Sequence, residues 1–333
     1  MSRIGVGVIG VGMMGRRHAE NAARRIDSAA LVAVYDYAAD LAKRVATELG
    51  AEPATSVDAL LARSDVQAVV VASPSRFHAE QAIAALDAGK DVLVEKPMAY
   101  TIADCDRMIA AAERAKVRLQ VGFMRRYDPA YAEARRLVSA GTIGEPQLVR
   151  AVHRDREAAH LPAATGVREM MFESTIHDFD LARFLLADDI ASLTTTAAVL
   201  CHERGDHGHA PTAALNAVRF TRGALADIET YWGAEYAYDV RTEIICAKGT
   251  AMVGHQQRTR LEVYTPDGAR HDLFPGFLER FDDAYLLELA DFVAGARERR
   301  PAAVTGADGR AAVAAALAGI DAFTTGVAVR PVA

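Results

Sequence analysis

The chain has 333 residues, of which 51% are hydrophobic and 25% are charged, and its formal net charge at pH 7 is -6. These values are typical of a globular protein with two domains of ordinary size. The absence of a Lys/Arg-rich run argues against nucleic acid as a partner, and no stretch reaches the roughly 18 apolar residues of a membrane span. The three widely spaced cysteines, Cys105, Cys201 and Cys246, form no disulfide framework and favour a reducing cytoplasm.

Short apolar runs alternate with helical patterns in the first third of the chain. Ser56 is placed to cap a short helix, and Thr101 with Asp104 three residues later resembles a capping box. Repeated strand–helix units predict a doubly wound parallel sheet, that is, a Rossmann domain. Its expected strands are residues 3–9, 31–35, 66–72, 91–94 and 117–121.

After residue 123 the pattern changes, because strands now come in groups with few helices between them. This grouping predicts a second α/β domain on a mostly antiparallel sheet. We place the boundary near Gly122, giving domains 1–122 and 123–333. The expected strands are 146–154, 191–200, 213–221, 224–232, 239–247 and 260–264, and the expected helices are 170–186, 282–299 and 308–323.

A glycine motif, Gly10-Val11-Gly12-Met13-Met14-Gly15, lies between the first strand and the first helix. Gly10 permits a tight turn, Gly12 lets a pyrophosphate approach the backbone, and Gly15 allows close helix–strand packing. The N–H groups at the start of the helix would face the phosphates. The alternative is a glycine-rich turn with a solvent-facing Asp36, which the strand–turn–helix context and the position of that acid disfavour.

Asp36 ends the second strand about 20 residues beyond the last glycine, where an acid holds the ribose hydroxyls of a dinucleotide. A carboxylate there repels a 2′-phosphate, so the sequence predicts NAD rather than NADP. Ser73 follows the apolar strand 66–72. Because strand C-termini line the ligand crevice of such sheets, we expect Ser73 to lie near the dinucleotide.

Lys96, at the end of strand 91–94, could bind a substrate oxygen and stabilise alkoxide character, although a lysine before proline is also typical of a surface loop. Glu173, His177 and Asp180 have spacings that place them on one face of a helix. Oxidation of an alcohol needs a proton acceptor, which His177 can be near neutral pH, with Glu173 orienting it. The alternative is an ordinary Glu–His surface pair.

Two further pairs could bind a polyol or be ordinary half-buried sheet residues: His153 with Asp155, and Tyr236 with Tyr238. The loop that carries Cys201, His202, His207 and His209 is rich in metal-ligand side chains. It lacks a CxxC or a helical HxxxH, so we predict no bound metal.

Together the motifs resemble the Gfo/Idh/MocA oxidoreductase family, and within it the inositol 2-dehydrogenases of carbohydrate metabolism. The resemblance implies a Rossmann domain followed by an α/β domain built on a large, mostly antiparallel open sheet, through which such proteins form dimers or tetramers. The segments that carry it are GVIGVGMMGRRH (7–18), VEKPMAYT (94–101), QVGFMRRYDPAY (120–131), ESTIHDFD (173–180), YAYDVRTEIICAKGT (236–250) and VTGADGRAA (304–312).

The resemblance implies NAD-dependent oxidation of a ring hydroxyl to a ketone. It assigns substrate positioning and proton handling to Lys96, proton acceptance to His177, and the adjacent acid to Glu173. The expected cofactor-binding residues are Gly10, Gly12, Met13, Met14, Gly15, Asp36, Ser73, His78, Glu95 and Lys96. The expected substrate-binding residues are Lys96, Met124, His153, Asp155, Glu173, His177, Asp180 and Tyr236.

Two departures from the family leave the inositol isomer, the oxidised carbon and the physiological direction open. Family members commonly have Asp where this chain has Glu173, and Asn-Pro where it has Asp155-Arg156. Another sugar, an anhydrosugar or a nucleotide-linked sugar is an alternative substrate, although no basic cluster for a diphosphate is evident. A non-catalytic NAD-bound sensor or co-repressor is a second alternative, against which the presence of Lys96 and His177 argues.

Overall fold

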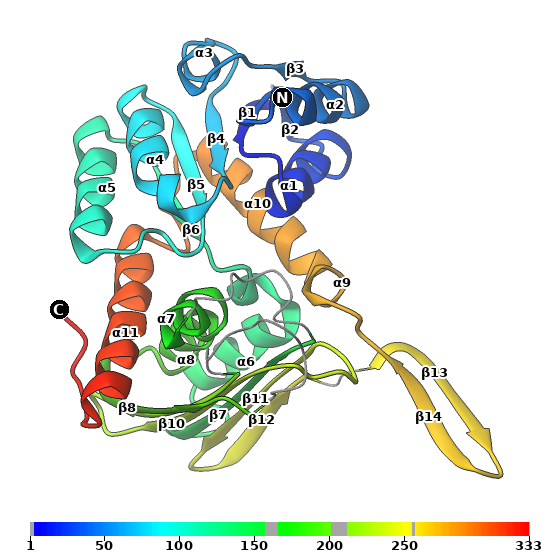
Figure 1. Ribbon diagram of the computed structural model, residues 1–333, viewed down its shortest axis with the longest axis vertical. Helices are drawn as coiled ribbons and strands as arrows, with labels where there is room; N and C mark the ends of the chain where they lie inside the picture. Colours follow the sequence, from blue (N-terminus) through cyan, green and yellow to red (C-terminus); the bar gives the residue numbers. More distant parts are fainter. Residues whose placement is uncertain (1–2, 157–165, 201–211, 255–256, 333) are drawn as a thin grey trace. The chain divides into compact units, whose positions relative to one another are not determined.

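The computed structural model describes residues 3–156, 166–200, 212–254 and 257–332. The chain forms two compact units (Figure 1). Unit 1 comprises Met1–Tyr127 and Asp283–Val313, and unit 2 comprises Asp128–Asp282 and Ala314–Ala333. None of the described helices is both long and apolar enough to cross a membrane.

Unit 1 is built on a six-stranded sheet of order β3-β2-β1-β4-β5-β6. All its pairings are parallel, as the βα repeats predict. Because the strand order reverses between β1 and β4, ligands are expected outside the carboxyl ends of these strands. The strands are β1 (Ile4–Ile9), β2 (Ala29–Tyr35), β3 (Glu52–Pro53), β4 (Ala68–Val71), β5 (Asp91–Glu95) and β6 (Leu119–Gly122).

Helices cover both faces of this sheet (Figure 1). Apolar residues of α1 (Met13–Arg24), α2 (Ala39–Leu49) and α10 (Asp282–Glu298) pack with β1 and β2 in one core. The other face carries α4 (His78–Asp87) and α5 (Ile102–Ala115).

Both predicted caps are present in unit 1. The Ser56 hydroxyl accepts the Ala59 N–H at 2.9 Å, at the start of α3 (Val57–Leu61). The Thr101 hydroxyl accepts the Asp104 N–H at 3.1 Å, at the start of α5. Each cap satisfies a backbone donor that the first helical turn leaves free.

The segment Asp283–Val313 packs with unit 1, whereas the sequence-based boundary places everything after residue 122 in the second domain. The physical reason is the apolar face of α10, from which Leu289, Phe292 and Val293 enter the core of the parallel sheet with no exposed surface. Periodicity predicts that this helix buries one face, but it does not tell which sheet receives that face.

Unit 2 is built on a six-stranded sheet of order β12-β11-β7-β10-β9-β8. The prediction of a mostly antiparallel sheet is confirmed, with one parallel pairing between β10 and β7. Its strands are β7 (Pro146–Asp155), β8 (Ile190–Ala198), β9 (Ala213–Phe220), β10 (Leu225–Trp232), β11 (Asp239–Cys246) and β12 (Gly249–Val253).

The sequence reading missed β3, β12 and the helix α6 (Pro129–Ser139). It also missed β14 (Gly268–Leu273), which forms a separate hairpin with the predicted strand β13 (Gln257–Thr265). A signal for α6 was present, because Asp128 caps it by accepting the N–H groups of Ala130 and Tyr131, and Pro129 occupies its first turn.

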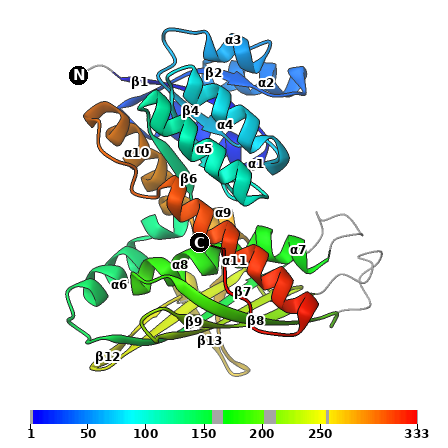
Figure 2. The same cartoon turned by 90° about the vertical axis from the view of Figure 1, so that its left-hand side faces the viewer.

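One face of the unit 2 sheet is covered by α6, α8 (Ile176–Leu186) and the end of α11 (Gly306–Thr325), and no described helix lies on its other face (Figure 2). Side chains alternate accordingly along β7, where Val149, Ala151 and His153 are buried while Arg150 is exposed. His153 therefore belongs to the helix-covered face, and Arg154 to the open face.

The helix predicted over 170–186 contains a π-helical turn. The order is α7 (Val167–Met170), the π segment Met171–Thr175, and α8. Inserted π-turns shift the phase of a helix and are frequent at functional sites. The predicted placement of Glu173, His177 and Asp180 on one face assumes a regular α-helix, which the π segment interrupts before His177.

Candidate functional site

The glycine-rich turn of unit 1 joins β1 to α1. Gly10 has φ +83°, and a Cβ on it would lie 2.5 Å from the Ser73 backbone. A Cβ on Gly15 would lie 1.7 Å from the Gly10 carbonyl oxygen, so both positions require glycine for packing. A Cβ on Gly12 would meet nothing within 4 Å. The open space at Gly12, beside the start of α1, fits a pyrophosphate on the helix N-terminus.

Asp36 is held beside this turn by two backbone donors. Its Oδ2 accepts the N–H of Val11 at 2.9 Å, and its Oδ1 accepts the N–H of Ala38 at 2.9 Å. The carboxylate is thus fixed at the end of β2, next to the glycine turn. This is the position from which an acid binds the ribose hydroxyls of NAD.

His78 connects two loops at the carboxyl ends of the parallel strands. Its Nε2 lies 2.8 Å from the Ser73 carbonyl oxygen, and its Nδ1 lies 2.8 Å from that of Pro97. Burial lowers the pKa of His78, although the two carbonyls favour its charged form. The ring is 1% exposed, so the structure uses His78 to tie the loop after β4 to the loop after β5.

Other predicted cofactor residues differ in accessibility. Met13, at the start of α1, is 55% exposed, and Met14 is half-buried. The Ser73 hydroxyl donates to Gln81 Oε1 at 2.5 Å. Lys96, which follows β5, is half-buried, and Met124 is buried in a short 3₁₀ turn, Met124–Tyr127.

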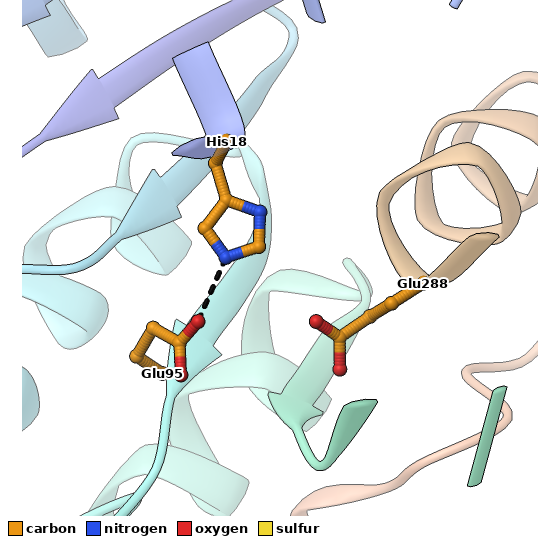
Figure 3. Close-up of side chains that lie close together, drawn as sticks. All are labelled: His18, Glu95 and Glu288. Atoms are coloured by element: carbon orange, nitrogen blue, oxygen red, sulfur yellow. Dashed lines mark hydrogen bonds and ion pairs between the residues drawn. The ribbon is translucent and has the colours of Figure 1, made fainter. Parts of the chain in front are cut away.

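Glu95, the last residue of β5, bonds to His18 of α1 inside unit 1 (Figure 3). The His18 Nε2 to Glu95 Oε1 distance is 2.7 Å, and Glu95 Oε2 accepts the Lys96 N–H at 3.2 Å. Burial alone raises the pKa of Glu95, but the bond to His18 and its positive neighbours outweigh burial, so that this pKa is lowered. The Glu288 carboxylate of α10 points toward the pair.

His18, Glu95 and Glu288 are the one group of possible metal ligands among the described residues, with ligand atoms within 4.8 Å of one another. An ion shared by His18 and Glu95 would have to replace their direct hydrogen bond. We therefore describe the cluster as a hydrogen-bonded pair with an acidic neighbour. The predicted non-ligands Cys201, His202, His207 and His209 lie outside the described residues.

Unit 2 brings two predicted histidines together. His177, in the first turn of α8, is 7% exposed, and His153, on β7, is 3% exposed. Their ring centroids lie 6.4 Å apart. His153 is flanked by two carboxylates, with its Nδ1 3.0 Å from Asp178 Oδ2 and its Nε2 3.4 Å from Asp155 Oδ2.

A hydrogen-bonded chain extends from Asp155 into the sheet. The Ser174 hydroxyl donates to Asp155 Oδ2 at 2.8 Å, and the Trp232 indole N–H donates to Ser174 Oγ at 2.9 Å. Sequence reasoning missed Ser174, Asp178 and Trp232. Asp178 follows His177 directly, which was an available signal, but Trp232 reaches the site only because β10 pairs in parallel with β7 and places it opposite Asp155.

The two tyrosines expected near the substrate have different surroundings. Tyr236 is 54% exposed, and its hydroxyl bonds to Asp239 Oδ2 at 2.5 Å and to the guanidinium of Arg154 at 3.1 Å. Because Arg154 belongs to the open face of the sheet, Tyr236 is not brought to the histidines. Tyr238 is 4% exposed, and its ring meets that of His153 edge-on at 6.0 Å.

Glu173 and Asp180 bracket His177 along the chain. Glu173 lies in the π segment and is half-buried, whereas Asp180, in α8, is 1% exposed. Asp155, Asp178, His153 and His177 form one set of neighbouring side chains in unit 2. Such a set can move a proton and bind several hydroxyl groups.

Comparison with known proteins gives matches to both units. The model of an oxidoreductase family with an NAD-binding Rossmann fold, GFO_IDH_MocA, matches residues 4–123. The model of the GFO/IDH/MocA C-terminal domain matches residues 131–252. These matches confirm the fold class that the sequence predicts.

Full-length relatives give the same result. The myo-inositol 2-dehydrogenase of Thermotoga maritima is 35% identical over 311 residues, covering 92% of each chain. The scyllo-inositol 2-dehydrogenase (NAD(+)) of Bacillus subtilis is 32% identical over 330 residues, covering 97% of this chain and 95% of its own. The structure of Lactobacillus casei scyllo-inositol dehydrogenase with bound NAD(H) and scyllo-inositol matches with a TM-score of 0.91 at 28% identity, covering 99% of each chain.

Proposed function

Because the chain belongs to the Gfo/Idh/MocA family of NAD-dependent oxidoreductases, we propose that it oxidises a ring hydroxyl of an inositol-type cyclic polyol to the ketone. The family resemblance and the choice of NAD, both inferred from sequence motifs, are confirmed by the family match. The substrate class is supported by the inositol dehydrogenases among the full-length relatives.

The observation that carries the proposal is the buried histidine pair of unit 2. Oxidation removes a hydride from the carbon and a proton from its hydroxyl, and NAD, when bound, accepts the hydride. His177 accepts the proton, because an imidazole does so near neutral pH. Its low exposure keeps bulk water from competing for that proton.

The remaining roles follow from charge and position. The Lys96 ammonium binds the oxygen that loses its proton and stabilises alkoxide character. Its backbone is held by Glu95, which accepts its N–H. Glu173 and Asp180 favour the charged form of His177 after proton transfer, while Met124, His153 and Asp155 complete the substrate contacts.

We further propose that the protein is a cytoplasmic homo-oligomer, either a dimer or a tetramer, and the open face of the unit 2 sheet supports the oligomer. Leu215 is 54% exposed, Leu225 44% and Met252 80%, and strand alternation places all three on this face. Large apolar side chains exposed on a sheet face that no described helix covers favour contact with a second copy. Light scattering of the wild type and of Met252→Glu tests this, since a monomeric wild type would contradict it.

The deciding experiment follows NADH formation by purified protein with NAD and a panel of inositols and aldoses, with NADP in parallel. Turnover on an inositol with NAD is expected, and loss of turnover in His177→Ala and in Lys96→Ala. Tyr264→Phe serves as the matched control, because Tyr264 is 74% exposed and its hydroxyl bonds to Glu262 on the hairpin of β13 and β14. Absence of turnover on every inositol, in protein that binds NAD, would overturn the proposed substrate class.

A further inference from the structure

His153 occupies an unusual electrostatic position in unit 2. Each of its ring nitrogens faces a carboxylate, Asp178 at 3.0 Å from Nδ1 and Asp155 at 3.4 Å from Nε2. A neutral imidazole has one N–H donor and one acceptor nitrogen, so it can satisfy only one of two ionised carboxylates. An imidazolium has two donors and can satisfy both.

Burial strengthens this argument. The Asp178 side chain has no exposed surface, the His153 side chain is 3% exposed, and the Asp155 side chain is 23% exposed. An ionised carboxylate as deeply buried as Asp178 is costly unless a positive charge and hydrogen bonds accompany it. Asp155 already accepts the Ser174 hydroxyl, which holds its carboxylate toward His153.

Among the described residues, the contacts of His153 given by distance involve no lysine or arginine side chain. Its titratable neighbours in these contacts are His177 and Asp178 of α8, Asp155 of the same strand, and Tyr238, whose ring meets the imidazole edge-on. Across the sheet, the register places Thr230 of β10 and Val240 of β11 opposite His153, and neither of them titrates.

We propose that Asp178 is a positioning residue that holds His153 as an imidazolium in the polyol site, so that Nε2 keeps a proton to donate. The substrate part of this inference rests on the proposed function. Donor Nε2 and acceptor Asp155 then lie side by side and match two adjacent hydroxyls of a polyol ring, one accepting and one donating. The positive charge beside His177 also disfavours a second proton there, which keeps His177 neutral before the substrate binds.

The charge of His153 is tested directly by ¹⁵N NMR of histidine-labelled protein, with His153→Gln identifying the signal. In the wild type, we expect both His153 nitrogens to remain protonated well above the ordinary titration midpoint of about pH 6.5. In Asp178→Asn, the amide oxygen can still accept the Nδ1–H, but the charge is gone. The titration midpoint should therefore fall, which a purely structural acceptor at position 178 would not cause.

The matched control is Asp189→Asn, which removes one negative charge from an exposed carboxylate paired with Arg183 beyond the end of α8. Its His153 signal should match the wild type. A neutral His153 in the wild type near pH 7, or equal midpoints in wild type and Asp178→Asn, would overturn the proposal. Asp155→Asn provides a second variant should Asp178→Asn fail to fold, and we expect a smaller shift because Asp155 is partly exposed.

Kinetics test the substrate part separately. Asp178→Asn should raise KM for the polyol by about tenfold, the size of a lost charge-assisted hydrogen bond, with a smaller change in kcat. The NMR measurement needs neither substrate nor cofactor. A confirmed imidazolium without polyol turnover would therefore refute the proposed substrate and leave the charge assignment standing. Polyol turnover with a neutral His153 would refute the charge assignment and leave the proposed substrate standing.

Discussion

His18 of α1 and Glu95 of β5 are joined by a 2.7 Å hydrogen bond between Nε2 and Oε1, and both side chains are buried. The bond connects the helix that follows the glycine turn to the strand that ends at Lys96. Because Glu95 also accepts the Lys96 N–H, a displacement of α1 would be transmitted to the lysine backbone. The helix that follows the cofactor turn and the lysine are thus linked through Glu95 by hydrogen bonds within unit 1.

Glu95→Gln should reduce stability in a pH-dependent way. The pKa of Glu95 is lowered in the fold, mainly because the bond to His18 outweighs burial. Its ionised form therefore contributes stability above the unfolded pKa of about 4.3, and this contribution disappears as pH falls through the lower folded pKa. In urea unfolding, we expect Glu95→Gln to lose about 1–3 kcal/mol near neutral pH and to differ less from wild type in acid.

The control for that measurement is Glu113→Gln, an exposed carboxylate on α5. It should follow the wild-type dependence of unfolding free energy on pH. An equal deficit of Glu95→Gln at acidic and neutral pH would show that the ionisation of Glu95 does not contribute to stability.

Gly12→Ala and Gly15→Ala should separate cofactor binding from folding. A methyl group at Gly12 meets no protein atom within 4 Å, whereas one at Gly15 would lie 1.7 Å from the Gly10 carbonyl oxygen. We expect Gly12→Ala to keep the wild-type melting temperature but bind NAD at least about tenfold more weakly, because the methyl group occupies the pyrophosphate position. Gly15→Ala should lower the melting temperature itself. Tight NAD binding by Gly12→Ala would contradict the assigned position.

Asp36→Asn should change the choice between cofactors. The amide keeps an oxygen for one of the two backbone N–H groups that Asp36 accepts, but it no longer repels a 2′-phosphate. We expect calorimetric titration to show weaker NAD binding, stronger NADP binding, and a ratio of the two affinities shifted by about tenfold or more. An unchanged ratio would mean that Asp36 serves only to shape the turn.

Features that depend on short stretches of sequence were predictable. The glycine motif, Asp36 and the caps at Ser56 and Thr101 each require only local spacing, and the structure shows both caps as expected. Five of the six parallel strands of unit 1 were equally clear, since they are mostly apolar, whereas the exposed two-residue strand β3 was missed.

Features that depend on pairing between distant segments were not predictable. Tyr238 contacts His153, whereas Tyr236 bonds to Arg154, and the path of the chain into β11 decides between them. The sequence pattern of the two tyrosines does not indicate which of them contacts the histidine. The π-turn before α8 carries no obvious sequence signal. Trp232 lies near Asp155 only through the parallel register of β7 and β10.

Trp232, the only tryptophan in the sequence, reports on the polyol site through its bond to Ser174. Ser174→Ala removes the hydroxyl that accepts the Trp232 indole N–H and donates to Asp155, so both hydrogen bonds are lost. We expect a shifted tryptophan emission, a loss of about 1–2 kcal/mol in unfolding free energy, and a raised KM for the polyol as Asp155 loses its orientation. Ser139→Ala, an exposed serine of α6, is the control and should change none of the three. A normal KM alongside a shifted emission would show that Ser174 supports the sheet without orienting Asp155.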